Sequence, residues 1–268
     1  MAAAQSLTDS GLQVTLDYLG EDTLDIEQAN ATRDAYVELL QQLAEHGLAA
    51  QCEVSVKLSA VGQALPEGGP RIATDNAARI CEAAQAAGTC VTLDMEDHTT
   101  TDLTLEALRE LRADHPETGA VLQAYLRRTP ADCRDLAGAG SRIRLCKGAY
   151  DEPESVALRD RGEVDRAYIR CLKILLDGAG YPMIATHDDR LIQIAEALVV
   201  RYDRAPDSYE FQMLYGVRGG EQRRLADAGH TMRVYVPYGN EWYGYLVRRM
   251  AERPANLMLG VRAILGWA

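Results

Sequence analysis

The chain has 268 residues, of which 47% are hydrophobic and 25% are charged, a composition typical of a globular protein with a sizeable core. Its 40 acidic and 28 basic residues give a net charge of −12, and no basic stripe is present, so nucleic-acid binding is not expected. No apolar stretch reaches the length of a membrane span, and the N-terminus lacks the regions of a signal peptide, so we expect a cytoplasmic protein.

Strand-like and helix-like patterns alternate along the chain. The predicted strands are Leu12–Leu19, Cys52–Ala60, Thr89–Glu96, Gly119–Leu126, Arg142–Tyr150, Pro182–Asp188, Ser208–Gly216 and Met232–Gly239. The predicted helices are Ile26–Glu45, Asp75–Ala87, Leu103–Arg112, Ala131–Ala137, Val164–Leu176, Arg190–Tyr202, Glu221–Ala228 and one carrying Arg248. Strands such as CVTLDM and YPMIATH are almost continuously apolar, as strands buried on both faces must be.

Eight strand–helix units in one domain of this length predict a closed (βα)8 barrel of the α/β class, spanning residues 1–268 as a single domain. The alternative is an open doubly wound sheet, which usually has a GxGxxG fingerprint in its first strand–helix turn. That turn reads LGEDT and has no such fingerprint. The barrel is therefore the preferred interpretation.

Cysteine and histidine spacing indicates neither a disulfide framework nor a metal site. The six cysteines show no CxxC pattern, and the five histidines include no HExxH. We expect the cysteines to be reduced and structural, and we expect no protein-bound metal.

Polar residues recur near the carboxyl ends of the predicted strands, where a barrel collects its catalytic groups. They are Lys57, Asp94, Glu96, Gln123, Arg144, Lys147, Tyr150, Thr186, His187, Glu210, Gln212 and Tyr235. A single one could be a paired core residue, but contributions from seven strands favour a ligand site.

The stretch RVYVPYGNEWYGYLVRRMAERPAN, from Arg233 to Asn256, joins the last strand to a helix bearing Arg248, Arg249 and Glu252. Taken alone, RRxxE is a solvated helix face with an i,i+4 ion pair. Beside Lys57 and Arg144 it would instead add guanidiniums to a cationic cleft, which predicts an anionic ligand.

Several motifs resemble those of the proline dehydrogenase family, most like its monofunctional bacterial type with a shortened N-terminus. They are SVKLSA, TLDMED, VLQAY, RLCKGAYDEP, ATHD, YEFQMLYGVR and VYVPYGNEWYGYLVRRMAERPAN, in the family's order. The resemblance implies a distorted (βα)8 barrel that binds a flavin, normally FAD with FMN as the alternative. It also implies oxidation of L-proline to Δ1-pyrroline-5-carboxylate by hydride transfer from C5 to flavin N5, the first step of proline catabolism to glutamate.

The resemblance also implies a role for individual residues. Lys57, Arg248 and Arg249 match the residues that hold the proline carboxylate. Asp94 and Tyr235 match pocket residues that the family couples by hydrogen bonding, and Tyr150 matches another wall of the pocket. Arg144 matches the arginine near flavin N5, so that Asp94 and Arg144 are the expected catalytic pair. The matching cofactor contacts are Met95, Gln123, Arg144, Lys147, Gly148, Ala149, Thr186, His187 and Glu252. Glu21 matches a gate residue that pairs with the arginine at Arg248.

In the family, electrons commonly pass to a membrane quinone, which implies transient association with the inner face of the membrane. The family usually begins with extra helices, of which this chain keeps at most the end, in Ala2–Asp9. The apolar tail, residues 257–268, is expected to be helical and to cover the flank left open or to pack against another subunit.

Two functions without a flavin also suit such a pocket. A barrel of this kind could be a Schiff-base lyase that uses Lys57 or Lys147, or a protein that binds small carboxylates without turnover.

Overall fold

Eight parallel strands close into a barrel in which each strand pairs with its neighbours in chain order, β8 returning to β1. The computed structural model describes residues 1–20 and 22–239. The strands are β1 (Gln13–Tyr18), β2 (Cys52–Val56), β3 (Val91–Leu93), β4 (Gly119–Gln123), β5 (Arg142–Cys146), β6 (Tyr181–Ala185), β7 (Glu210–Leu214) and β8 (Met232–Tyr238). The predicted (βα)8 barrel of the α/β class is confirmed.

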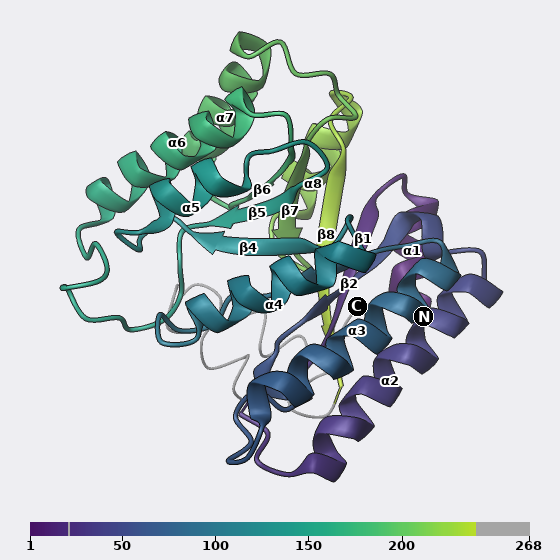
Figure 1. The fold of residues 1–268 in the computed structure, drawn as a ribbon. Coiled ribbons are helices and arrows are strands. Elements are labelled where there is room, and N and C mark those ends of the chain that lie inside the picture. The colour runs from purple at the N-terminus through teal and green to yellow at the C-terminus, as the bar shows by residue number, and fades with distance from the viewer. Residues whose placement is uncertain (21, 240–268) are drawn as a thin grey trace.

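Helices surround the barrel, with α2, α3 and α4 on one side and α5, α6 and α7 on the other (Figure 1). Their bounds are α1 (Ala2–Asp9), α2 (Ile26–Glu45), α3 (Gly69–Ala87), α4 (Thr101–Asp114), α5 (Thr129–Leu136), α6 (Arg161–Asp177), α7 (Asp189–Arg201) and α8 (Gly219–Asp227). Short 3₁₀ turns at Ala49–Gln51 and Ser59–Val61 precede and follow β2.

Several boundaries differ from the predicted ones, and two of these differences have clear local reasons. Helix α3 begins at Gly69, six residues before the predicted start, because Pro70 lies in its first turn, where the missing N–H of proline has no intrahelical partner to lose. Strand β5 ends at Cys146 and not at Tyr150, because Gly148 has φ +117°, which a strand cannot continue. The residues after Cys146 are thereby released into a loop at the barrel mouth.

Aspartate side chains cap the N-termini of three helices. Asp25, Asp160 and Asp188 each accept a backbone N–H from the first turn of α2, α6 and α7 respectively. Each carboxylate thus satisfies an otherwise unpaired donor and complements the positive end of the helix dipole. These caps fix where the chain leaves the mouth of the barrel.

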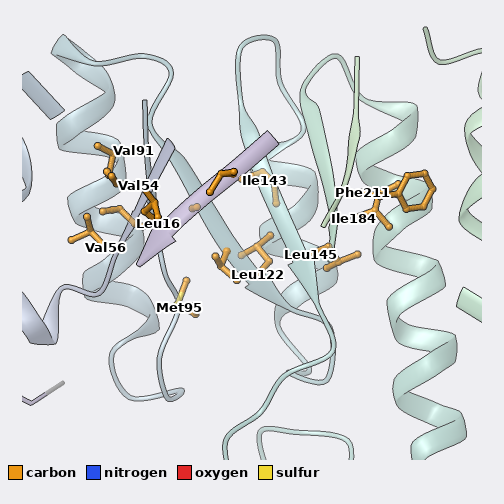
Figure 2. Close-up of a cluster of buried hydrophobic side chains, with 14 of the residues drawn as sticks. Leu16, Val54, Val56, Val91, Met95, Leu122, Ile143, Leu145, Ile184 and Phe211 are labelled. Atoms are coloured by element: carbon orange, nitrogen blue, oxygen red, sulfur yellow. The ribbon is translucent and has the colours of Figure 1, made fainter. Parts of the chain in front are cut away.

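The hydrophobic core lies between the barrel and its helices. Figure 2 shows side chains from successive strands in this layer, among them Leu16, Val54, Leu122, Ile143 and Ile184. Along β1, β2 and β5 such residues alternate with polar ones, so the apolar side of these strands faces the helices.

The barrel interior is polar, as contacts between non-adjacent strands demonstrate. Arg144 on β5 donates to Ser55 on β2 at 2.9 Å, and Tyr235 on β8 donates to Asp94 beyond β3 at 2.7 Å. Such bonds can only pass through the inside of the barrel, because the strands involved are not neighbours. The fold therefore holds a buried network of charges along its axis.

All six cysteines are free thiols, four of them buried. Among residues 1–20 and 22–239, no helix has the length and apolar character needed to cross a bilayer. The predicted helix with Arg248 and the predicted tail, residues 257–268, lie outside the described residues.

Candidate active site

Asp94 is the centre of a cluster at the carboxyl ends of the strands. It follows β3, where its backbone N–H continues the ladder by donating to the Val56 carbonyl at 2.8 Å. Its Oδ1 accepts from Ser55 at 2.8 Å and from Arg144 Nη1 at 2.7 Å. Its Oδ2 accepts from the Tyr235 hydroxyl at 2.7 Å. Four strands are thus tied to one carboxylate.

Lys57 reaches the same carboxylate from the end of β2. Its Nζ lies 2.7 Å from Asp17 Oδ2 and 3.6 Å from Asp94 Oδ2, and Lys57 is buried. Asp17, on β1, is a member of this site that sequence reasoning missed. The signal was present, because Asp17 and Thr15 are polar residues two apart that alternate with the apolar Val14 and Leu16, as expected for an inward-facing pair.

Arg144 is fixed on several sides. Besides Ser55 and Asp94, it donates from Nε to Gln212 Oε1 at 2.6 Å and from Nη2 to Glu53 Oε1 at 3.3 Å. Its guanidinium carbon lies 5.2 Å from the centre of the Tyr235 ring. A buried guanidinium with this many acceptors has a defined plane, which a solvated one lacks.

The surroundings shift the pKa values of the groups in this cluster in different directions. Burial alone raises the pKa of Asp94, but Lys57 and Arg144 outweigh it, so the pKa of this carboxyl lies below its usual value. Burial raises the pKa of Asp17 despite the attraction of Lys57. Burial also raises the pKa of Tyr235 well above its usual value, so its phenol remains a hydrogen-bond donor. Asp94 is therefore a stable anion and a weak base. Its role is to orient the groups that donate hydrogen bonds to it.

A second charged layer lies below the cluster. Glu53 accepts from Arg142 at 2.7 Å, and Arg233 donates to Glu210 at 2.8 Å. Burial opposes ionisation of Glu53, but Arg233, Arg142 and Arg144 together lower its pKa to about 2. Glu210, which sequence reasoning placed in the lining of the cleft, is fully buried in this layer, because it stands at the first position of β7.

Residues expected at the cofactor lie at the end of β4, on β5 and just after it, and just after β6. The Gln123 amide donates to the Glu96 carbonyl at 2.8 Å, and Glu96 itself accepts from the Ser59 hydroxyl at 2.6 Å. Lys147 lies 2.8 Å from Asp188 and 2.6 Å from Asp165, which raise its pKa against the effect of burial.

The other residues expected at the cofactor have different surroundings. The Thr186 hydroxyl accepts from the Asp188 N–H at 3.1 Å, and His187 Nε2 accepts from the Leu214 N–H at 2.9 Å. That bond leaves Nδ1 of His187 as the protonated nitrogen of a neutral ring. Met95 is buried and packs in the hydrophobic cluster of Figure 2.

Gly148 shapes the loop that follows β5. A Cβ at this position would lie 2.2 Å from the Tyr125 ring, in addition to the strain of φ +117°. Tyr125 holds the same loop through its backbone N–H, which donates to the Lys147 carbonyl at 2.9 Å. Ala149 beyond it is exposed, and Tyr150 is half-buried. Close packing of backbone against ring therefore sets the course of the loop.

Of the predicted site residues, Lys57, Asp94, Arg144 and Tyr235 are brought together. Lys147 and Thr186 share Asp188 and form a second group. Glu21, Arg248, Arg249 and Glu252 lie outside the described residues. Within the part of the chain that the structure describes, no group of three or more His, Cys, Asp and Glu side chains is arranged to hold a metal ion.

The sequence and the fold are both similar to those of known proteins. A family model described as proline dehydrogenase matches residues 1–258. The chain is 40% identical to the proline dehydrogenase of Deinococcus radiodurans over 267 residues, which cover 98% of this chain and 85% of that protein. It is 38% identical to proline dehydrogenase 1 of Bacillus subtilis (strain 168) over 259 residues, which cover 97% of this chain and 84% of the relative.

Among solved structures, the fold is similar to that of proline utilization A from Bdellovibrio bacteriovorus inactivated by N-propargylglycine. The TM-score is 0.83 with 27% sequence identity, and the match covers 93% of this chain but 31% of that longer chain. Since the family model spans nearly all of the sequence and the two bacterial relatives match over most of their own length, this chain belongs to the proline dehydrogenase family and resembles its monofunctional bacterial members.

Proposed function

We propose that the protein is a flavin-dependent enzyme that oxidises L-proline to Δ1-pyrroline-5-carboxylate, the first step of proline catabolism to glutamate. The observation that carries the proposal is the convergence of Lys57, Arg144 and Tyr235 on Asp94, at the mouth of a barrel in a member of the proline dehydrogenase family. Barrel enzymes carry out their chemistry at this end.

The donor set at the ends of β4, β5 and β6 fits a flavin. Lys147 supplies a cation for a phosphate group, and the Gln123 amide and the Arg144 guanidinium supply donors for a polar ring system. We favour FAD over FMN because FAD is normal in this family. Met95, Gly148, Ala149, Thr186, His187 and Glu252 are the further residues proposed to contact it. When bound, the flavin supplies N5 as the acceptor of the hydride from proline C5.

On the substrate side, Lys57 together with Arg248 and Arg249 would bind the proline carboxylate, and Tyr150 and Tyr235 would form walls of the pocket. The ionised Asp94 opposes Lys57 and aligns the Tyr235 hydroxyl, so its role is to orient these groups. Binding the carboxylate of proline also positions its ring. This lowers the entropy that must be lost on the way to the transition state. Glu21 is proposed to act as a gate by pairing with Arg248.

The lyase alternative is weakened by the surroundings of both lysines. A Schiff base needs a neutral amine, whereas Lys57 is held between Asp17 and Asp94, which favour its charged form. Lys147 is likewise paired with Asp165 and Asp188, and its pKa is raised. Neither amine is prepared to act as a nucleophile.

A spectroscopic experiment tests the proposal directly. The purified protein, reconstituted with FAD, should show flavin absorbance that bleaches when L-proline is added without oxygen. D-proline serves as the control for nonspecific reduction. A protein that remains colourless and has no affinity for FAD would overturn the proposal and leave carboxylate binding without turnover as the alternative.

The proposal extends to the electron acceptor and the location. We propose that reduced enzyme passes electrons to a membrane quinone during transient contact with the inner face of the membrane, and that it otherwise resides in the cytoplasm. We also propose that residues 1–268 form one domain, in which the tail, residues 257–268, covers the barrel flank or contacts a second subunit. Ubiquinone-dependent turnover with vesicles present tests the first of these points.

A further inference from the structure

Arg144 rests on a chain of buried side chains from β7 and β8. Gln212 Oε1 accepts from Arg144 Nε at 2.6 Å, and Gln212 Nε2 donates to Glu210 Oε1 at 2.5 Å. Glu210 Oε1 also accepts from Arg233 Nε at 2.8 Å. Gln212 is 3% exposed and Glu210 is 0% exposed, so solvent does not compete for these bonds.

The two neighbours of Gln212 select one orientation of its amide. Arg144 has only donors, so the amide oxygen must face it, and the Glu210 carboxylate accepts, so the amide NH₂ must face Glu210. If the amide were flipped, its NH₂ group would face the N–H donor of Arg144 and its oxygen would face the acceptor oxygen of Glu210. Glu210 thereby determines which group Gln212 presents to Arg144.

The bond to Gln212 completes the fixation of the guanidinium. Nη1 is held by Ser55 and Asp94, and Nη2 by Glu53 at 3.3 Å, all of them from β2 or the end of β3. Gln212 holds Nε from β7, at the other side of the barrel. Without it, the guanidinium would be held from one side, and a buried N–H would lack this acceptor.

We propose that Gln212, oriented by Glu210, is a positioning residue that sets the plane of the Arg144 guanidinium and, through it, the rate of flavin reduction, without contributing to proline binding. The part that concerns the flavin rests on the proposed function. The hydrogen bonds of Gln212 described above go to Arg144 and Glu210, and neither of these is proposed to bind the proline carboxylate, so the loss of Gln212 should affect kcat and leave KM in place.

Three neutral or nearly isosteric variants separate this role from a purely structural one. Gln212→Leu removes the acceptor for Nε without changing charge. Tyr181→Phe is the matched control, because it removes a hydrogen bond to the other oxygen of Glu210, 3.2 Å away, and leaves Oε1 in place. Glu210→Gln keeps an acceptor oxygen for Gln212 but removes the ion pair with Arg233, so it should lower stability while Gln212 stays oriented.

The first readout needs no flavin. In ¹⁵N–¹H spectra of the apoprotein, the Arg144 Nε–H signal is assigned by its loss in Arg144→Met, and its exchange with solvent is measured. We expect exchange at least about tenfold faster in Gln212→Leu, because a charge-assisted bond is lost. Exchange should remain as in the wild type in Tyr181→Phe and in folded Glu210→Gln.

The second readout uses the FAD-loaded enzyme. Gln212→Leu should lower kcat for L-proline by about tenfold, shift the flavin midpoint potential downward, and leave KM within about twofold. Tyr181→Phe should match the wild type in all three quantities.

Unchanged Nε–H exchange in Gln212→Leu overturns the positioning role. Faster exchange with a wild-type kcat and potential overturns the link to the flavin and makes Gln212 a structural residue. A wild type that binds no flavin is a different failure, that of the proposed function, and the exchange experiment on the apoprotein still decides whether Gln212 fixes Arg144.

Discussion

Tyr235 illustrates how a single half-buried phenol can combine two roles. Its hydroxyl donates to Asp94 at 2.7 Å, and its ring lies beside the Arg144 guanidinium. Both contacts hold the ring in one position, and a rigid ring makes a selective wall. A hydroxyl on the proline ring would meet this wall, so trans-4-hydroxy-L-proline should be a poor substrate by at least about tenfold.

Trimming that wall should change the preference between the two substrates. Tyr235→Ser is expected to lower kcat/KM for L-proline more than for trans-4-hydroxy-L-proline, because proline alone loses a well-packed surface. Steady-state kinetics with both substrates measures the ratio. Tyr235→Phe is the control, since it keeps the ring and removes only the bond to Asp94. If the ratio is the same in Tyr235→Ser as in the wild type, Tyr235 does not determine specificity.

Gly148 is the position where backbone conformation and close packing coincide. Gly148→Ala would combine φ +117° with a Cβ 2.2 Å from the Tyr125 ring, so the loop after β5 must move. We expect the purified variant to contain much less flavin per chain, measured from the ratio of flavin to protein absorbance.

A matched glycine controls for strain without a clash. Gly140 also has a positive φ, +77°, but a Cβ there would meet nothing within 4 Å. Gly140→Ala should therefore lose about 1 kcal/mol of stability and keep its flavin. Equal flavin content in the two variants would show that the packing at Gly148 is unimportant for the site.

At the scale of elements, Glu152 connects two loops at the barrel mouth. Its Oε1 accepts from the backbone N–H of His98, in the loop after β3, at 2.7 Å, and its other oxygen bonds the His98 ring. Glu152 is 5% exposed and follows Tyr150 in the loop after β5. The loop that carries the proposed pocket wall is thus tied to the loop that follows Asp94.

Breaking this connection should destabilise the mouth. Glu152→Ala leaves a backbone N–H and a histidine without their acceptor, which typically costs about 1–3 kcal/mol. We expect a corresponding decrease in the free energy of unfolding in urea and a higher KM for proline. The neighbouring Asp151→Ala is the control, because the Asp151 side chain is 95% exposed and should contribute almost nothing. Equal unfolding free energies and equal KM values in Glu152→Ala and Asp151→Ala would contradict this role of Glu152.

At the scale of the whole molecule, the barrel wall separates an apolar layer under the helices from a charged interior. Apolar side chains fill the space between strands and helices (Figure 2), whereas the interior holds Glu53, Arg142, Arg233 and Glu210 in mutual contact. Buried charges are tolerated only when paired, since an isolated one costs several kcal/mol. Stability should therefore depend on pH through this network.

Glu53 allows that dependence to be assigned. Its pKa is lowered from 4.5 to about 2, so its ionisation stabilises the folded protein above about pH 4.5, and that contribution disappears as the pH falls towards about 2. The difference between these two pKa values corresponds to roughly 3 kcal/mol of stability. The difference in unfolding free energy between the wild type and Glu53→Gln should accordingly shrink over this pH range.

The comparison with a variant is needed because Asp17, with its raised pKa, contributes with the opposite sign. Glu45→Gln, at the exposed end of α2, is the control and should stay within about 0.5 kcal/mol of the wild type at each pH. A Glu53→Gln difference that does not vary with pH would contradict the assignment.

The sequence by itself determined the eight strands, the seven helices that follow β1 to β7, and the polar residues at the strand ends. All are local properties, because alternation with a period of two and runs of apolar residues are visible in any short segment. Lys57, Asp94, Arg144 and Tyr235 could be named as site residues for this reason, and the motif resemblance supplied their roles.

Apart from the bond between Asp94 and Tyr235, which the motif resemblance implied, the tertiary structure decided which of these residues meet. Asp17 became the partner of Lys57 across 40 residues of sequence, and Asp94 that of Arg144 across 50. Glu210 went to the layer below the site, and Gln212 became the acceptor for the Nε–H of Arg144. Strand register and barrel closure fix these pairings, and a spacing in sequence carries no information on which side chains the closed barrel will place opposite each other.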